Sequence, residues 1–157
     1  AYGPMIRDQL HFVIDALNSD PDTRQAVLTI WRPNPRPSKD IPCTVSIQFL
    51  IRDGHLHVVD TMRSSDLWLG WPYDVFNFSM LARYVICHLK KKPELGLLTL
   101  QAGSMHLYEA QWSAAEEIVG GKATQQPIPT IPWFEHGDDL VDWLWEQANG
   151  TGILETK

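Results

Sequence analysis

Residues 60–78, which read DTMRSSDLWLGWPYDVFNF, constrain the fold of this chain more than any other stretch. The stretch begins as a β-strand, turns through two serines and an aspartate, and passes Gly70 and Pro72 before an apolar helix. A strand–turn–helix passage gathers its polar side chains in a tight turn, and such turns often bind ligands. The residues also allow a simpler interpretation, in which the serines and Asp66 only cap the helix.

Hydrophobic periodicity predicts both helices and strands along the rest of the chain. Asp53-Gly54 is a strong hairpin signal between two strands, and the proline-rich loop RPNPRPSKDIP precedes the first of them. The predicted helices cover residues 5–18, 75–89, 108–119 and 138–148, and the predicted strands cover residues 25–31, 43–52, 55–63 and 95–103. This order of elements predicts an α+β fold, in which helices pack on a mixed sheet.

The length of 157 residues suits one domain with a substantial core. We expect this core to cover residues 1–122, followed by a proline-punctuated linker and a C-terminal helix within residues 123–157. The formal net charge of −6 argues against nucleic-acid binding, because no excess of cations is present to displace counterions from phosphates. A small phosphorylated ligand needs only a local cluster of arginines.

Cysteine use and hydropathy indicate the compartment. Two cysteines, Cys43 and Cys87, do not make a disulfide framework and suggest a reducing environment. Residues 1–157 contain no secretory signal and no apolar run of membrane length. We therefore expect a cytoplasmic protein without a membrane partner.

Three motifs occur in a specific order. Ile41-Pro42-Cys43 leads into the strand CTVSIQFLI, the turn RSSDLWLGWPYD follows, and GSMHLYE comes last. This ordered set, from about Tyr2 to Tyr108, resembles the thymidylate synthase superfamily, which includes pyrimidine nucleotide methylases and cytidylate hydroxymethylases. Members of this superfamily carry an amino-terminal segment with a catalytic glutamate, an arginine loop and part of the folate site. Residues 1–157 contain no counterpart of this segment. We expect a fragment of a longer chain; a shortened homologue that only binds nucleotide is the alternative.

The resemblance implies that Cys43 is the nucleophile that attacks C6 of the pyrimidine ring and makes C5 reactive towards a one-carbon unit. Cysteine is more often a small buried hydrophobe, and Cys87 within YVICHL fits that role. Cys43 differs because it follows a proline at a strand start and comes ahead of an arginine-bearing turn. A neighbouring arginine would favour the reactive thiolate.

The resemblance also implies a phosphate site. Arg63 and Ser64 match the phosphate-binding pair of the family, and a guanidinium fork suits phosphate. Arg24 matches an arginine that is donated across a dimer interface, although Gln25 stands where the family usually has a second arginine. A surface ion pair is the alternative role of Arg24. We therefore expect a homodimer that associates sheet to sheet through its apolar strands.

Four further residues match the base and sugar contacts of the family. The backbone amide of Asp66 is expected at O2 of the pyrimidine, and Gln48 is expected to order the site, although it suits an ordinary strand position nearly as well. His106 and Tyr108 are assigned to the sugar hydroxyl, and their spacing places both on one side of an extended segment.

Asp74 indicates which base is bound. Uracil-specific members of the family have asparagine at this position. Cytosine presents an acceptor at N3 and an amino donor at C4, which a protonated carboxyl matches; an ionised carboxylate can pair with N3-protonated cytosine. An ionised aspartate would face O4 of uracil, acceptor against acceptor. The alternative role of Asp74 is an N-cap for a helix beginning near Val75.

Together with Asp74, the resemblance implies a folate-dependent cytidylate 5-hydroxymethyltransferase that uses 5,10-methylenetetrahydrofolate and CMP or dCMP. The alternatives are a thymidylate synthase, which methylates dUMP, and a non-catalytic nucleotide-binding homologue. A metal site is not expected, because His55 and His57 share a spacing but lack a third ligand, and a solvent-facing hairpin explains them better.

Overall fold

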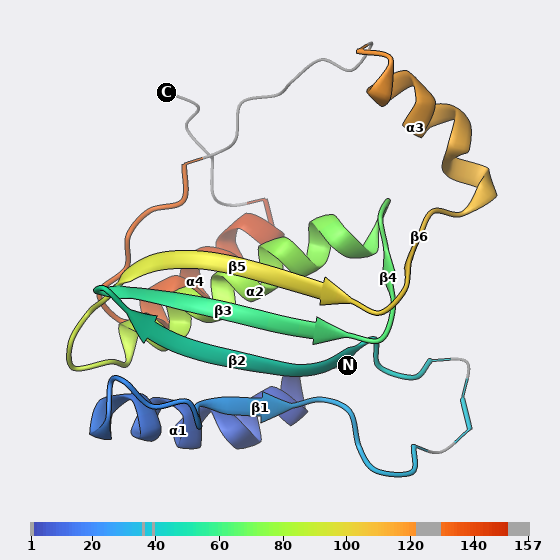
Figure 1. Cartoon of the computed structure of the whole chain (residues 1–157). Helices are drawn as coiled ribbons and strands as arrows, with labels where there is room; N and C mark the ends of the chain where they lie inside the picture. The colour runs from blue at the N-terminus through green and yellow to red at the C-terminus, as the bar shows by residue number, and fades with distance from the viewer. Residues whose placement is uncertain (1, 36, 39, 122–129, 151–157) are drawn as a thin grey trace.

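A computed structural model gives the fold of residues 2–35, 37–38, 40–121 and 130–150. The elements follow in the order α1 (Gly3–Ser19), β1 (Val27–Thr29), β2 (Thr44–Arg52), β3 (His55–Met62), β4 (Ser65–Asp66), α2 (Gly70–Cys87), β5 (Glu94–Ala102), β6 (Met105–His106), η1 (Glu109–Gln111), α3 (Trp112–Val119) and α4 (Gly137–Ala148). Figure 1 shows helices packed against one twisted sheet. The predicted α+β fold is confirmed.

The main sheet has the strand order β1-β2-β3-β5. β1, β2 and β3 pair antiparallel and β5 joins β3 in parallel, so the sheet is mixed as predicted. Asp53 and Gly54 turn the β2–β3 hairpin with φ of 50° and 77°, the left-handed conformations that a tight two-residue hairpin requires. A second, two-stranded sheet of β4 and β6 lies beyond the ends of β3 and β5 (Figure 1).

One face of the main sheet carries the hydrophobic core. On β3 every second residue from Leu56 to Met62 is buried, because alternate side chains of a strand point to the same face. Side chains of α1 and α2 pack on this face, and α4 packs on α2 (Figure 1). The core residues include Val13, Leu17, Leu28, Ile47, Phe49, Val58, Phe78, Val85 and Ile86.

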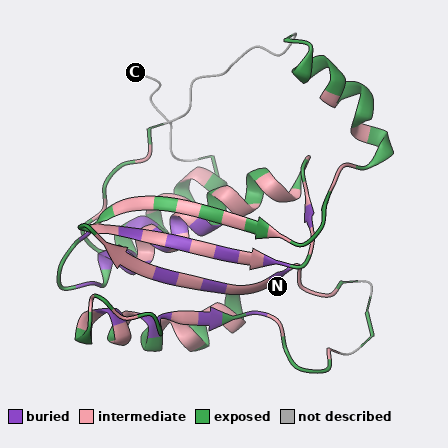
Figure 2. Ribbon diagram, in the orientation of Figure 1, coloured by how far each residue is buried: buried purple, intermediate pink, exposed green. Residues whose placement is uncertain are grey.

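The opposite face of the sheet is only partly buried, as the alternating colours of its strands show in Figure 2. Ser46, Gln48 and Val59 lie on this face at neighbouring register positions, and Leu97 of β5 is 71% exposed. α3 extends away from the sheet and is exposed along most of its length (Figures 1 and 2).

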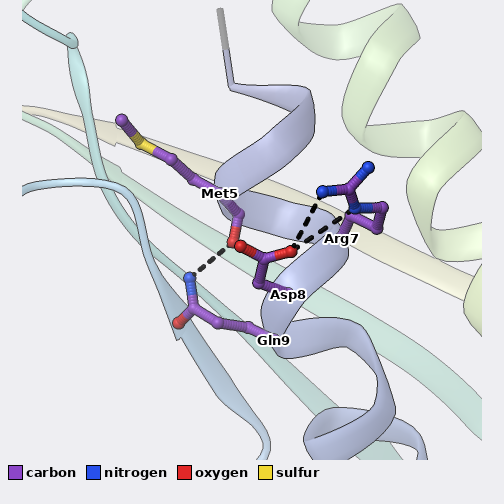
Figure 3. Close-up of polar contacts among 4 residues, drawn as sticks. All are labelled: Met5, Arg7, Asp8 and Gln9. Atoms are coloured by element: carbon purple, nitrogen blue, oxygen red, sulfur yellow. Dashed lines mark hydrogen bonds and ion pairs between the residues drawn. The ribbon is translucent and has the colours of Figure 1, made fainter.

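Gln9 attaches α1 to the edge of the sheet. Its side-chain Nε2 donates to the carbonyl oxygen of Thr29 at 2.8 Å, and its Oε1 accepts from the Thr29 N–H at 2.9 Å. The same Nε2 also donates to the Met5 carbonyl within the helix, as Figure 3 shows beside the contact between Arg7 and Asp8. The Gln9 amide therefore binds the backbone of β1 as a neighbouring strand would.

Several predicted boundaries are wrong. α2 begins at Gly70 instead of residue 75, because proline is tolerated in the first helical turn, where Pro72 lies. The strand expected over residues 25–31 is limited to Val27–Thr29, and a 3₁₀ turn precedes α3. The C-terminal helix is confirmed as α4. Most of the expected linker falls in residues 122–129, outside the described residues.

None of the described helices combines the length and the apolar character that crossing a membrane requires.

Candidate active site

The candidate residues gather at one end of the main sheet. At this end β2 begins, β3 and β5 end, and α2 starts, as Figure 1 shows beside β4 and β6. The short parallel pairing of Ser65 with Met105 and of Asp66 with His106 brings the turn after β3 against the segment after β5. Two motifs that are distant in sequence therefore meet here.

The peptide of Cys43 is held from two sides. Its N–H donates to the Tyr2 hydroxyl at 2.8 Å, and its carbonyl accepts from the Arg63 N–H at 2.8 Å. The same Tyr2 hydroxyl accepts from the Thr44 N–H at 3.3 Å. Cys43 is a partly buried free cysteine. Its backbone is thus fixed immediately before the first residue of β2.

Arg63 contacts the loop that leads to Cys43. Its Nε donates to the Pro42 carbonyl at 2.9 Å, and Nη2 donates to the Ile41 carbonyl at 2.8 Å. The guanidinium carbon lies 6.0 Å from the ring centroid of Trp31, within the range of a cation–π contact. A guanidinium has five N–H donors, so these two bonds leave three for a ligand. Arg63 and Cys43 are therefore brought together.

Ser64, His106 and Tyr108 form a second group. The Ser64 hydroxyl lies 3.4 Å from Nδ1 of His106, and the rings of His106 and Tyr108 meet edge to face with centroids 5.0 Å apart. Ser64 directly follows Arg63 in the chain. The expected phosphate-binding and sugar-binding residues are thus neighbours at this end of the sheet.

The carboxylate of Asp66 stabilises the turn before α2. It accepts from the N–H groups of Trp68 at 3.0 Å and Leu69 at 3.2 Å. These hydrogen bonds lower the pKa of Asp66, the bond from Trp68 most, because they favour the ionised form. The side chain of Asp66 therefore binds the turn before α2 and does not cap the helix, whose N-cap is Leu69; the expected contact with the base concerns the Asp66 backbone amide.

Asp74 faces a cavity of about 330 Å³. The wall of this cavity is formed by Tyr2, Gly3, Ile6, Asp74, Asn77, Phe78 and Leu81. Burial raises the pKa of Asp74, because a low dielectric disfavours its charge. Asp74 lies four residues inside α2, so the N-cap role considered for it is wrong. Tyr2 connects the two parts of the site, since it lines this cavity and binds the peptide of Cys43.

Arg24 and Gln48 lie elsewhere in this chain. Nε2 of Gln48 donates to the Arg24 carbonyl at 2.9 Å, and the Arg24 side chain is exposed in the turn before β1. Gln48 is five residues along β2 from Cys43, which corresponds to roughly 17 Å. Within one copy of the chain these two residues are not brought to Cys43.

The sequence analysis gave no role to Asp60 or Tyr2. Asp60 is 0% exposed on β3, and neither carboxylate oxygen has a hydrogen-bond partner among the described residues. Burial, and then the charge of Asp74, raise the pKa of Asp60 to about 7. A signal was present: Asp60 occupies an inward position in the alternation of HLHVVDTM, where the other inward residues are apolar.

Within the described ranges, no three His, Cys, Asp or Glu side chains are grouped so that they could hold a metal ion.

Sequence comparisons define the class of protein. The family described as thymidylate synthase matches residues 4–149, and the chain therefore belongs to the thymidylate synthase family.

The names of individual relatives are consistent with membership of this family. A protein of Methanosarcina barkeri named "Putative thymidylate synthase" is 34% identical over 128 residues, covering 76% of this chain and 58% of the relative. The thymidylate synthase of varicella-zoster virus is 27% identical over 140 residues, covering 88% of this chain and 45% of the viral protein. The chain thus spans about half the length of these relatives.

Proposed function

We propose that this protein transfers a one-carbon unit to C5 of a cytidylate, CMP or dCMP, and forms the 5-hydroxymethyl product. The observation that carries the proposal is the position of Asp74 on the wall of a cavity that it shares with Tyr2. The Tyr2 hydroxyl also holds the peptide of Cys43. Tyr2 therefore links the cavity wall to the backbone of Cys43, although Cys43 itself is not among the residues that line the cavity.

The proposed chemistry begins at Cys43. Its thiolate sulfur forms a bond to C6 of the pyrimidine, and the electrons of the C5–C6 double bond move onto C5, which becomes nucleophilic. After C5 has acquired its new substituent, it loses its proton and the sulfur–C6 bond breaks, which restores the ring and the thiolate. Covalent addition divides a difficult substitution into easier steps.

The phosphate of the nucleotide is assigned to Arg63 and Ser64. Arg63 retains donors beyond the two that bind the loop, and these suit the oxygens of a phosphate. Ser64 adds a hydroxyl, and its neighbour His106 is assigned with Tyr108 to the sugar.

A homodimer is part of the proposal. Arg24 and Gln48 contact each other beside the partly exposed face of the sheet, far along β2 from Cys43. If two copies associate through this face, Arg24 of one copy can reach the phosphate in the other. A monomer in light scattering that binds nucleotide tightly would contradict this arrangement.

Cytosine is the proposed base because Asp74 is a carboxyl in a partly buried setting. A carboxylate facing O4 of uracil would pair acceptor with acceptor, which is costly where water cannot compensate. Cytosine offers its amino group at that position, so its edge can be satisfied.

The proposed one-carbon donor is 5,10-methylenetetrahydrofolate. Apolar side chains are exposed at the start of α2, with Leu69 57%, Tyr73 65% and Phe76 45% exposed. In the proposal, the planar pterin of the folate packs on these side chains, beside Asp74. When bound, the folate supplies a carbon at the methylene level of oxidation. Addition of water to that carbon gives a hydroxymethyl group, and reduction gives a methyl group.

The test is to incubate the protein with methylenetetrahydrofolate and CMP, dCMP or dUMP, and to follow products by mass spectrometry. We expect a cytidylate product heavier by one CH₂O group, and no product with Cys43→Ala. Turnover of dUMP alone would disprove the choice of cytosine.

Methylation of dUMP is the second candidate, and the names of the archaeal and viral relatives favour it. Asp74→Asn discriminates between the two candidates. An amide matches the N3 donor and O4 acceptor of uracil, so a cytosine-specific enzyme should shift its preference towards dUMP. An unchanged preference would contradict the pairing of Asp74 with the base.

A further inference from the structure

The cavity beside Asp74 has the size and the wall of a small-molecule site. Its volume is about 330 Å³, at the lower end of the roughly 300–1,000 Å³ that such sites span. Ile6, Phe78 and Leu81 make much of the wall apolar, and the polar side chains that α2 adds to it are those of Asp74 and Asn77. Asn77 has no role in the site described so far.

Asn77 lies on the same face of α2 as Asp74. The two residues are three positions apart, a spacing that makes them neighbours on the surface of a helix. Helical side chains lean towards the amino terminus of their helix, and Asp74 follows this rule, since a Cβ at Gly70 would lie 3.9 Å from its Oδ2. The same lean directs the amide of Asn77 over the turn that carries Asp74.

The amide of Asn77 has no structural task among the described residues. Its side chain is exposed and makes no hydrogen bond within that part of the chain. Asparagine is also a weaker helix former than alanine, so helix stability does not explain its presence inside α2. The amide therefore keeps one acceptor oxygen and two N–H donors for a ligand.

The amino group of cytosine needs two acceptors. It has two N–H bonds in the plane of the ring, one directed towards N3 and one directed towards C5. In the proposed function the first pairs with Asp74. The second needs an acceptor of its own, because a donor that loses water without gaining a partner lowers the affinity.

Among the described residues of the cavity wall, Asn77 supplies the remaining side-chain acceptor. The Tyr2 hydroxyl already accepts from the N–H groups of Cys43 and Thr44, which uses its acceptor capacity. Gly3 has no side chain, and the other wall residues apart from Asp74 are apolar. The second amino N–H is thus matched by the amide oxygen of Asn77.

We propose that Asn77 is a second base-binding residue, whose Oδ1 accepts the cytosine amino N–H that points towards C5. The inference rests on the proposed function, because it concerns the same base site. Asp74 and Asn77 then hold the amino group from both sides. The Asn77 amide can also rotate and donate from Nδ2 to O4 of uracil, so Asp74 selects between the two bases. Asn77 excludes cytosines that carry a substituent on the amino nitrogen.

The first measurement needs no variant. Calorimetry compares the binding of CMP with that of N4-methyl-CMP, which has one amino proton instead of two. When that proton pairs with Asp74, the methyl group points towards C5, where Asn77 lies. N4-methyl-CMP should therefore bind the unaltered protein about tenfold more weakly than CMP, because it loses a hydrogen bond and crowds the amide. Equal affinities would overturn the inference.

The second measurement repeats the comparison with Asn77→Ala. The affinity for CMP should fall about fivefold, the effect of one lost hydrogen bond. The two nucleotides should then bind within about twofold of each other, because alanine leaves room for the methyl group and has no acceptor to lose. Urea unfolding should show no loss of stability, since alanine is the better helix former at this exposed position.

Asn149→Ala is the matched control, because it makes the same substitution at the end of α4, and Asn149 is not among the residues that line the cavity. This variant should bind both nucleotides as the unaltered protein does. An unchanged preference for CMP over N4-methyl-CMP in Asn77→Ala, or equal losses of CMP affinity in Asn77→Ala and Asn149→Ala, would overturn the inference and leave the proposed function intact. Failure of every form to bind CMP would overturn both.

Discussion

Asp60 and Asp66 belong to one continuous stretch, yet their environments act on them in opposite directions. Asp66 lies in the turn, where backbone N–H groups bind its carboxylate and lower its pKa. Asp60 lies in the strand, where burial and the charge of Asp74 raise its pKa. The difference shows that a carboxylate in this segment stabilises the fold only where the backbone supplies donors.

The largest effect should come from Asp60→Leu. A carboxyl whose pKa is raised by folding contributes most stability below pH 3.8, and that stability is lost as pH rises towards 7. The shift of Asp60 from 3.8 to about 7 corresponds to an effect on the order of 2–4 kcal/mol. Urea unfolding should therefore find Asp60→Leu more stable by this amount above pH 7, with the difference shrinking as pH falls. If Asp60→Leu were less stable than the unaltered protein at all pH values, the claim that the buried Asp60 carboxyl destabilises the fold would be contradicted.

Asp66→Ala should have the opposite sign. It removes the acceptor of the Trp68 and Leu69 N–H groups, and loss of such hydrogen bonds costs about 1 kcal/mol. Because folding lowers the pKa of Asp66, its contribution is present above the ordinary carboxyl value and is lost as pH falls below it. The same unfolding assay should show a deficit near neutral pH that disappears in acid; a deficit unaffected by acid would argue against the carboxylate as the cause.

The smallest effect on stability is expected from a substitution of Gly70, the first residue of α2. A Cβ at this position would lie 3.4 Å from Cβ of Asp66 and 3.9 Å from Oδ2 of Asp74, which are ordinary contacts. Gly70→Ala should therefore raise the free energy of unfolding by roughly 0.5 kcal/mol, because alanine loses less backbone entropy on folding. Thermal unfolding measures this change, and a clear loss of stability would show that the start of α2 has no room for a methyl group.

The sequence predicted the sheet and its hairpin well because both depend on local patterns. Asp53-Gly54 fixes a two-residue turn, and the turn sets the register that pairs Ile47 with Asp60. That register brings the beginning of β2 beside the end of β3, and a shift of one residue between Thr44 and Ser46 then places Cys43 next to Arg63. Turn chemistry and strand period thus bring these two predicted residues to the same end of the sheet, whereas their exact pairing depends on an irregularity that the sequence did not show.

Two parts of the site were not predicted, for different reasons. The contact of Tyr2 with the peptide of Cys43 joins residues 41 positions apart, and no local pattern reports where α1 docks. Asp60 was visible as a polar residue at an inward strand position, but the sequence did not show that Asp74 would lie near it. That relation depends on how α2 packs on β3, which is a tertiary property.

The amide of Gln9 has a consequence for how this protein can associate. It occupies both backbone groups of Thr29 at the outer edge of β1, the positions at which a strand from another molecule would dock. The β1 edge of the sheet is therefore blocked at Thr29 from pairing with a further strand, which prevents extension of the sheet at this position. A strand from another molecule could pair with Thr29 only by displacing the Gln9 side chain.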